Sequence, residues 1–236
     1  MTLVIVVGVL VLLGVAVLWI LLHPSDRVLR RIAGFYPGTI FCGDTREHVV
    51  ALTIDDAPHP DVTPGILREL RADGVRATFF ILGANASAYP DLIDAIRADG
   101  HELANHLFTD RISARLSDRA FVDELRRTDE LIQPQGTPKW CRPGSGILTP
   151  RLVRLMRENG YTPVAGTAYP VDLRTSVGFT VNHFLQNIRP GAILVLHDGG
   201  ARRMNNIKVL STLLPRIRQR GYRMVTLTEL SRVCRG

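Results

Sequence analysis

Residues 49–58 have the sequence Val-Val-Ala-Leu-Thr-Ile-Asp-Asp-Ala-Pro. The apolar, β-branched first part predicts a buried strand over residues 49–54, and the two acids and the proline mark the place where that strand ends. Adjacent carboxylates at the end of a buried strand repel each other unless a cation or hydrogen-bond donors compensate them. An aspartate-rich turn would explain this stretch alone, so its meaning depends on the rest of the chain.

Segments typical of strands and helices alternate after this stretch. Further strands are predicted at 77–82, 101–105, 139–142, 162–166, 192–196 and 223–227, and helices at 63–72, 91–98, near 180–188, at 206–220, after Ser117 and from Pro150. Strands that alternate with helices imply parallel βα units. The pattern therefore predicts an α/β fold, either a barrel or an open doubly wound sheet.

The N-terminal segment differs in character from the rest of the chain. Residues 2–22 carry no charge, and at about 1.5 Å per residue a helix of this length spans roughly the 30 Å core of a bilayer. We predict a transmembrane anchor here and not a cleaved signal peptide, because no Lys or Arg precedes the run and no small-x-small site ends it. Residues 23–45, with scattered glycine and proline, are predicted to be a membrane-proximal linker, and residues 46–234 the main domain.

The charges bear on location and partners. Arg27, Arg30 and Arg31 follow the expected anchor and no basic residue precedes it, which favours a cytoplasmic main domain by the positive-inside rule. The net charge is +7, and we expect it to be spread over solvated helix faces. No basic run is interleaved with aromatic residues, so nucleic acid is not an expected partner.

The three cysteines are Cys42, Cys141 and Cys234, and their spacing is not that of a metal site. Cys42 and Cys234 flank the main domain, and a disulfide between them is one possibility in an oxidising compartment. Which of the three would pair is left open.

Polar side chains follow five of the predicted strands. They are Asp55 and Asp56, Asn105 and His106, Arg142, Tyr169 and Asp172, and His197 and Asp198. The carboxyl ends of parallel strands meet at one face, where α/β barrels and open sheets build their active sites. One such group is a turn, but five groups on one face predict a site.

A metal centre is one use for these side chains. His106 and Asp110 are four residues apart, so if the chain turns helically after the third strand, both can bind one ion together with an aspartate of the first strand. Three protein ligands with open positions are typical of a catalytic metal. Zinc is the first expectation, although one histidine with two carboxylates also suits manganese, iron or cobalt.

Two further side chains suit acid–base chemistry. Arg142 is always charged and needs a carboxylate at an inner strand end, for which Asp55 is the expected partner. This pairing would hold Asp55 ready to act as a base. His197 follows the apolar run 192–196, so we expect its imidazole at the floor of the site, where it suits proton transfer.

In this order, four motifs resemble those of the polysaccharide deacetylase family, the chitin deacetylase-like carbohydrate esterases. The motifs are Thr-Ile-Asp-Asp-Ala-Pro at 53–58, Asn-His-Leu-Phe-Thr-Asp at 105–110, Arg-Pro-Gly-Ser-Gly at 142–146 and Leu-His-Asp at 196–198. The resemblance covers roughly residues 46–230. It implies a distorted, incomplete (β/α) barrel of about seven parallel strands that holds one divalent metal ion and removes N-acetyl groups from amino-sugar glycans such as chitin oligomers or a peptidoglycan-like polymer.

The resemblance also implies roles for single residues of a catalytic domain at 46–234. The residues concerned are Asp55 as general base, Asp56 and His106 as metal ligands, Arg142 as the residue that holds the base, His197 as general acid, Asp172 as the acid that orients the histidine, Ser145 as oxyanion donor through its backbone N–H, and Leu196 in the acetyl-methyl pocket. Tyr169, on the same rim, is expected to contact substrate.

This chain departs from the family pattern at a few positions. Asp110 stands where the family has a second metal-binding histidine, Ala57 replaces a glycine, and Arg-Pro-Gly-Ser at 142–145 lacks the usual aromatic residue. The alternatives are an O-acetyl esterase, a hydrolase of another C–N bond, or a membrane-anchored pseudoenzyme that binds glycan. A glycan substrate places the domain outside the cytoplasm or in a lumen, against the indication of the flanking arginines. The sequence predicts no oligomeric state.

Overall fold

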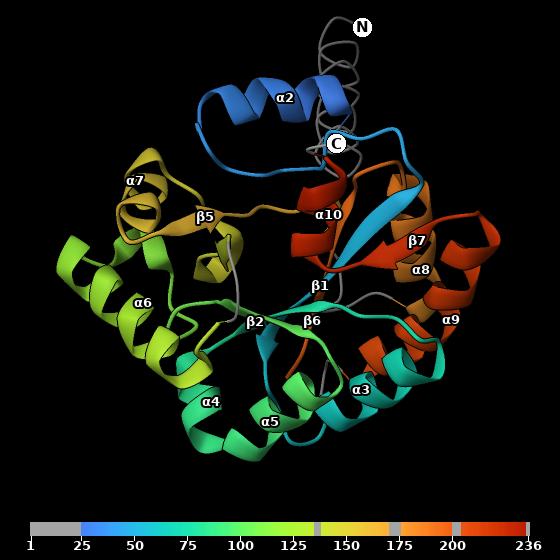
Figure 1. Ribbon diagram of the computed structural model, residues 1–236, viewed down its shortest axis with the longest axis horizontal. Helices are drawn as coiled ribbons and strands as arrows, with labels where there is room; N and C mark the ends of the chain where they lie inside the picture. Colours follow the sequence, from blue (N-terminus) through green and yellow to red (C-terminus); the bar gives the residue numbers. More distant parts are fainter. Residues whose placement is uncertain (1–24, 135–137, 170–175, 200–203, 235–236) are drawn as a thin grey trace, which may run out of the picture.

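Seven parallel strands form one sheet in the computed structural model, which describes residues 25–134, 138–169, 176–199 and 204–234 (Figure 1). The order is β5-β4-β3-β2-β1-β6, and β7 also pairs with β1. The strands are β1 (Val49–Ala57), β2 (Thr78–Ile81), β3 (Glu102–Asn105), β4 (Lys139–Cys141), β5 (Tyr161–Pro163), β6 (Ile193–His197) and β7 (Arg223–Val225). The predicted α/β fold with parallel strands is confirmed.

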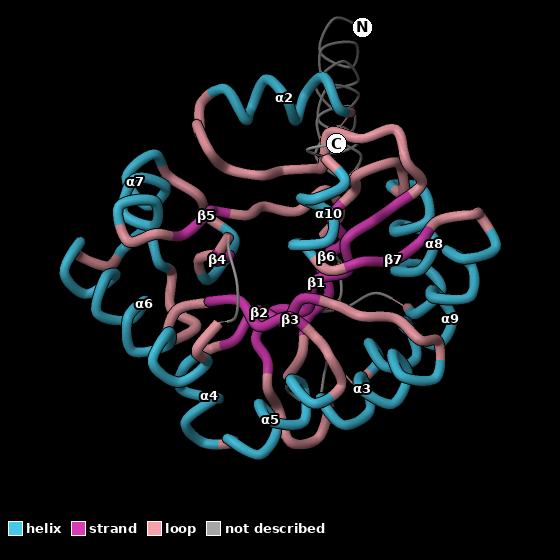
Figure 2. The backbone as a smooth tube through the Cα atoms, in the orientation of Figure 1, coloured by secondary structure: helices cyan, strands magenta, loops and turns pink. Residues whose placement is uncertain are grey.

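The two ends of the sheet approach each other after β5. Ala168 forms a parallel bridge with Leu194 of β6, and the backbone N–H of Thr167 donates to the carbonyl of Ile193 at 2.8 Å. The path of the backbone therefore curves round as a barrel, with helices outside it (Figure 2). Because β4 and β5 are only three residues long, the barrel is distorted on this side.

The helices cover the outside of the barrel and one of its ends. They are α2 (Asp26–Gly34), α3 (Thr63–Ala72), α4 (Gly83–Ala88), α5 (Pro90–Ala98), α6 (Asp118–Ile132), α7 (Pro150–Glu158), α8 (Val177–Asn187), α9 (Asn205–Gln219) and α10 (Leu227–Val233), with 3-10 turns at Ser113–Arg115 and Gly144–Gly146. The six helices predicted from the sequence are present. Helices α2, α4 and α10 were not predicted from the sequence.

The start of α10 shows why one boundary was placed wrongly. A strand was predicted to run to residue 227, but β7 ends at Val225 and a capping box begins the helix at Thr226. The Thr226 hydroxyl accepts from the N–H of Glu229 at 3.2 Å, and the Glu229 carboxylate accepts from the N–H of Thr226 at 3.0 Å. These bonds satisfy donors that a helix otherwise leaves free, so they favour helix over a longer strand.

Strand β1 lies at the centre of the sheet and is buried on both faces. Val49 and Ala51 face the barrel interior with Phe80 and Trp140. Leu52 and Ile54 belong to the outer core, which includes apolar residues of α3 and α9. A strand buried on both faces has a continuous apolar sequence, which is the pattern seen at 49–54.

Helix α10 closes the amino-terminal end of the barrel. Trp140 at the start of β4 donates from Nε1 to Thr228 Oγ1 at 3.0 Å and to Glu102 Oε1, at the start of β3, at 3.1 Å. The N–H of Leu227 donates to Thr78 Oγ1, at the start of β2, at 2.9 Å. With this end closed, the carboxyl ends of the strands form the open end.

The stretch predicted as a linker packs on the barrel. It contains α2, forms a bridge between Ile40 and Val164, and bonds the N–H of Gly43 to the carbonyl of Gly191 at 2.7 Å. The expected anchor at 2–22 lies outside the described residues, and none of the helices within them is long and apolar enough to cross a membrane. Within the described residues no disulfide joins Cys42, Cys141 or Cys234.

Gly191 allows the closest approach between this stretch and the barrel. Its φ is +77°, and a Cβ atom there would lie 2.1 Å from the carbonyl oxygen of Gly43. We expect Gly191→Ala to lower the free energy of unfolding by at least about 2 kcal/mol, because backbone on both sides resists movement and the φ is unfavourable for alanine. Urea denaturation measures the change.

Gly178 provides the control, because a Cβ there meets no atom within 4 Å and it lies in α8. Gly178→Ala should raise stability by roughly 0.5–1 kcal/mol through helix propensity. Equal effects of the two substitutions would show that the contact between Gly43 and Gly191 is not tight.

Candidate active site

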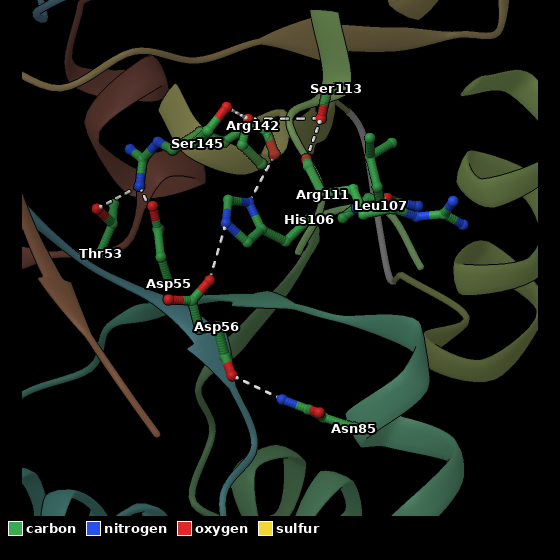
Figure 3. Close-up of polar contacts among 12 residues, drawn as sticks. Thr53, Asp55, Asp56, Asn85, His106, Leu107, Arg111, Ser113, Arg142 and Ser145 are labelled. Atoms are coloured by element: carbon green, nitrogen blue, oxygen red, sulfur yellow. Dashed lines mark hydrogen bonds and ion pairs between the residues drawn. The ribbon is translucent and has the colours of Figure 1, made fainter. Parts of the chain in front are cut away.

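A buried ion pair lies at the carboxyl end of β1. Arg142 donates from Nη1 to Asp55 Oδ1 at 2.5 Å and to Thr53 Oγ1 at 3.0 Å (Figure 3). It also donates from Nη2 to the carbonyl of Ala165 at 3.2 Å. Its guanidinium carbon lies 4.2 Å from the centre of the Phe80 ring. Arg142 and Asp55 are only 1% and 3% exposed. The expected pairing is confirmed, and its several donors fix the orientation of the Asp55 carboxylate.

The next residue, Asp56, faces a histidine. Asp56 has a φ of 65°, and its backbone carbonyl accepts from Asn85 Nδ2 at 3.0 Å. Its Oδ1 lies 3.3 Å from His106 Nε2. The other ring nitrogen, His106 Nδ1, lies 2.6 Å from the carbonyl oxygen of Arg142. Because a carbonyl only accepts, Nδ1 carries a proton and Nε2 is the nitrogen that faces Asp56, as is typical of a metal-binding histidine.

The electrostatic surroundings of His106 favour a positive charge. Burial lowers the pKa of its imidazole, but the negative charge of Asp55 and the hydrogen bond with Asp56 outweigh this, so that the pKa is raised above its usual value. The two neighbouring carboxylates are those of Asp55, which pairs with Arg142, and Asp56. Their negative charge attracts a cation to the space between Asp56 and His106.

The segment after β3 is not helical, so the condition under which His106 and Asp110 would share one helix face is not met. Asn105 turns the chain instead: its Oδ1 accepts from the N–H of Leu107 at 2.9 Å, and Leu107 has a φ of 65°. Asp110 is exposed, and its Oδ1 lies 3.7 Å from the position that a Cβ on Gly144 would take. It therefore lies against the loop that follows β4.

The structure tests whether these side chains suit a metal ion. A carboxylate oxygen and an oriented imidazole nitrogen face each other at Asp56 and His106, which is suitable donor chemistry. Within the described ranges, however, no three side chains of His, Cys, Asp or Glu gather closely enough to hold one ion. Asp110 as the third ligand stays a prediction.

His197 ends β6 beside Asp55. The two residues are register partners on parallel strands, so their side chains leave the sheet on the same side. The carbonyl of His197 accepts from Asn206 Nδ2 at 2.8 Å, and the N–H of Asp198 donates to the carbonyl of Asp55 at 2.7 Å. These bonds hold the ends of β1 and β6 together and keep His197 beside Asp55. The imidazole of His197 at the floor of the site stays a prediction.

Asp198 is fully buried behind this strand end and bonds to the Thr63 hydroxyl. Burial raises the pKa of its carboxyl to about 7, and the negative charge of Asp56 adds to this rise. Hydrogen bonds from the Thr63 hydroxyl and from the N–H groups of Gly199 and His59 oppose it. Asp198 thus links α3 to the site. The sequence placed it on the rim but gave no indication of its bond to Thr63, because a contact so distant in the chain leaves no local pattern.

The remaining predicted residues lie in different surroundings. Ser145 is exposed, has a φ of 61°, and donates from its hydroxyl to the carbonyl of Gly144 at 2.5 Å. Tyr169 is 40% exposed and accepts from the N–H of Gly166 at 2.6 Å. Leu196 is buried in the outer core with Ile54. Asp172 lies outside the described residues, and the roles of all four stay predictions.

The fold and these contacts define a class of protein: an α/β barrel with a cluster of buried ionisable residues at the carboxyl ends of its strands. A family model described as polysaccharide deacetylase matches residues 42–164. The chain is 34% identical over 196 residues to a chitooligosaccharide deacetylase of Bradyrhizobium sp., and the match covers 77% of this chain and 90% of the relative.

Two solved structures are also similar. The crystal structure of the Bc1960 peptidoglycan N-acetylglucosamine deacetylase superposes with a TM-score of 0.78 at 28% identity, over 83% of this chain and 93% of that one. BA3943, described as a CE4 family pseudoenzyme from Bacillus anthracis, superposes with a TM-score of 0.75 at 26% identity, over 83% of this chain and 69% of that one. This protein therefore belongs to the polysaccharide deacetylase family. Its enzyme class is that of hydrolases acting on carbon–nitrogen bonds other than peptide bonds.

Proposed function

We propose that this protein is a metal-dependent deacetylase that hydrolyses the N-acetyl groups of amino-sugar glycans, either chitin oligomers or a peptidoglycan-like polymer. One observation carries the proposal: the oriented pair of Asp55 and Arg142 lies directly beside the facing pair of Asp56 and His106. The first pair suits proton removal from water, and the second suits a cation. The names of the relatives support the choice of substrate.

Asp56 and His106 would hold the ion, with Asp110 as the proposed third ligand. Zinc fits this donor set, and cobalt or manganese would fit it too. When bound, the ion would polarise the acetyl carbonyl and make a bound water more acidic.

The chain's own residues would carry the proton transfers. Asp55 would take a proton from the water that attacks the acetyl carbonyl, while Arg142 holds the carboxylate in place. His197 would give a proton to the leaving nitrogen as the C–N bond breaks, so that the products are acetate and a free amine. These two residues are register partners on adjacent strands, so their side chains leave the sheet on the same side, which supports this pair of roles.

The other predicted residues would bind and orient. The backbone N–H of Ser145 would donate to the oxyanion, and Asp172 would orient the imidazole of His197. Tyr169 would contact the sugar, since part of its ring is exposed at the rim. Leu196 would line the pocket for the acetyl methyl group, which requires that its side chain becomes accessible from the outer core.

The first test is acetate release from N-acetylglucosamine oligomers and from peptidoglycan. The protein would be freed of metal and then supplied with zinc, cobalt or manganese in turn. Acetate that depends on the ion is the outcome expected. An O-acetyl esterase would instead release acetate only from O-acetylated glycans. If none of these substrates yields acetate, the proposal is contradicted and glycan binding without turnover is favoured. The structural argument for that alternative is that no third ligand joins Asp56 and His106 within the described residues.

The His106→Ala substitution tests the metal assignment. We expect it to weaken zinc binding at least about a hundredfold, because it removes the nitrogen that faces Asp56. Equilibrium dialysis followed by elemental analysis measures the bound zinc. His48→Ala is the matched control, because His48 is exposed and stacks on Tyr222. Equal zinc binding by the two variants would place the ion elsewhere.

We also propose that residues 2–22 anchor the protein as a single membrane span and that the domain at 46–234 lies outside the cytoplasm or in a lumen. A glycan substrate supports this side of the membrane, and the arginines after the anchor favour the other. Protease protection tests the topology in sealed inside-out vesicles, whose cytoplasmic side faces outward. Digestion of the domain by added protease would overturn the proposed topology.

A further inference from the structure

Helix α2 has two different faces. Its inner face carries the buried Leu29 and the partly buried Ala33, four residues apart. On the opposite side, Arg27, Arg31 and Phe35 follow one another at intervals of four residues, with Ile32 beside them, and all four are exposed. We call these four residues, of which Phe35 is the C-cap that follows the last turn, the outer stripe of α2.

The outer stripe combines exposed apolar surface with unpaired charge. Phe35 is 74% exposed and Ile32 is 38% exposed. Within the described part of the chain, Arg27 and Arg31 form no ion pair and no side-chain hydrogen bond, whereas Arg71 and Arg218 on the barrel helices pair with Asp99 and Asp73. Unpaired arginines next to an exposed aromatic ring and an aliphatic side chain are typical of a helix that lies in a membrane interface.

The barrel holds α2 only partly. A cavity of about 290 Å³ separates it from α10, with Leu29 and Ala33 on one side and Leu230 and Cys234 on the other. A helix above such a cavity makes fewer packing contacts, so its backbone opens more readily. A surface that binds the outer stripe would stabilise α2 from the side that faces away from the barrel.

The position of α2 relates this surface to the site. Helix α2 faces α10, which closes the amino-terminal end of the barrel, across the cavity that Leu29 and Leu230 line, and it is drawn above α10 in Figure 1. The amino-terminal end is the closed end, whereas Asp55, His106 and Arg142 lie at the open end. A surface that covers the outer stripe therefore leaves the site accessible.

We propose that the outer stripe of α2 binds an anionic lipid bilayer, with Arg27 and Arg31 at the phosphates and Phe35 and Ile32 in the headgroup layer. Positive charge and aromatic surface match this one partner. With nine residues, α2 is about 14 Å long, so it lies on a bilayer and does not cross it. In the sequence, α2 begins shortly after the uncharged run 2–22, which would bring it to the same surface. The proposal does not depend on the reaction at the site.

Hydrogen exchange of the α2 amides tests the proposal in the full-length protein. The protein would be mixed with vesicles of phosphatidylcholine alone or of phosphatidylcholine with phosphatidylglycerol, and exchange followed by mass spectrometry. We expect exchange to slow at least about tenfold with the anionic vesicles, and the effect to shrink at high salt.

Two pairs of substitutions make the test specific. Arg27→Glu with Arg31→Glu should abolish the slower exchange. Arg119→Glu with Arg126→Glu makes the same change of charge at exposed positions of α6 and should leave it intact. Phe35→Ser should reduce the effect by removing the inserted ring.

Three outcomes would overturn the proposal. Exchange could be the same with both kinds of vesicle, the α6 pair could have the same effect as the α2 pair, or α2 could be protected equally without lipid in a self-associated form. The last outcome would make a second copy of the chain the partner.

Discussion

Replacing Asp55 by asparagine should lower kcat/KM for acetate release at least about a thousandfold, since the variant has no group to take the proton of the attacking water. Asparagine has the same shape, and its side-chain oxygen can still accept from Arg142, so the loss should lie in kcat more than in KM. Zinc binding should be retained, because Asp56 and His106 are unchanged. Steady-state kinetics with zinc-loaded protein measures the loss.

The control for this prediction is Asp61→Asn on the loop that follows β1. The Asp61 side chain is 76% exposed, and among the described residues its carboxylate pairs with His59 alone, at 3.9 Å, so activity should be unchanged. A fully active Asp55→Asn protein would remove Asp55 from the mechanism. If both variants lost activity equally, the loop as a whole would be responsible and not the carboxylate of Asp55.

Replacing Arg142 by methionine should lower the free energy of unfolding by about 3–5 kcal/mol, the range for breaking a buried ion pair on one side. Asp55 would remain buried without its cation, and Thr53 and Ala165 would lose a donor. Urea denaturation measures the change. The pair of the exposed Arg68 and the half-buried Glu69 at 3.5 Å is the control, because Arg68→Met should cost about 0–1 kcal/mol.

A double-mutant cycle separates the ion pair from general packing. In the Asp55→Asn, Arg142→Met double variant no buried charge is left alone, so the loss of stability should be clearly smaller than the sum of the two single losses. Additive losses would indicate that Arg142 stabilises the barrel through its contact with Phe80 and its carbonyl partner, and not through Asp55.

The two ends of the barrel suggest a division of tasks. The closed end carries α10, α2 and the outer stripe, and the open end carries the candidate site. If α2 lies on a bilayer, the site faces away from the membrane, toward a polymer at some distance from the lipid. An anchored deacetylase would then reach a glycan without moving the barrel from the surface.

The main features of the fold could be predicted because they depend on local patterns. The apolar run 49–54 is continuous because β1 is buried on both faces, and helices such as α3 and α6 show their periodicity and caps directly. The polar residues at strand ends were predicted to share one face for a general reason, since the carboxyl ends of parallel strands meet. That reasoning located Asp55, Asp56, His106, Arg142 and His197 correctly at one end of the barrel.

Distant contacts decided the rest. The helical turn expected after β3 does not form, because the Asn105 side chain bonds to the N–H of Leu107 and turns the chain. Helix α10 closes the barrel through bonds to Thr78, Glu102 and Trp140, and Asp198 is buried against Thr63. Sequence patterns record the surroundings of a residue over one or two turns of helix or along one strand. They leave open which side chain, far along the chain, completes a hydrogen bond or covers a helix face, because only the assembled barrel brings those groups together.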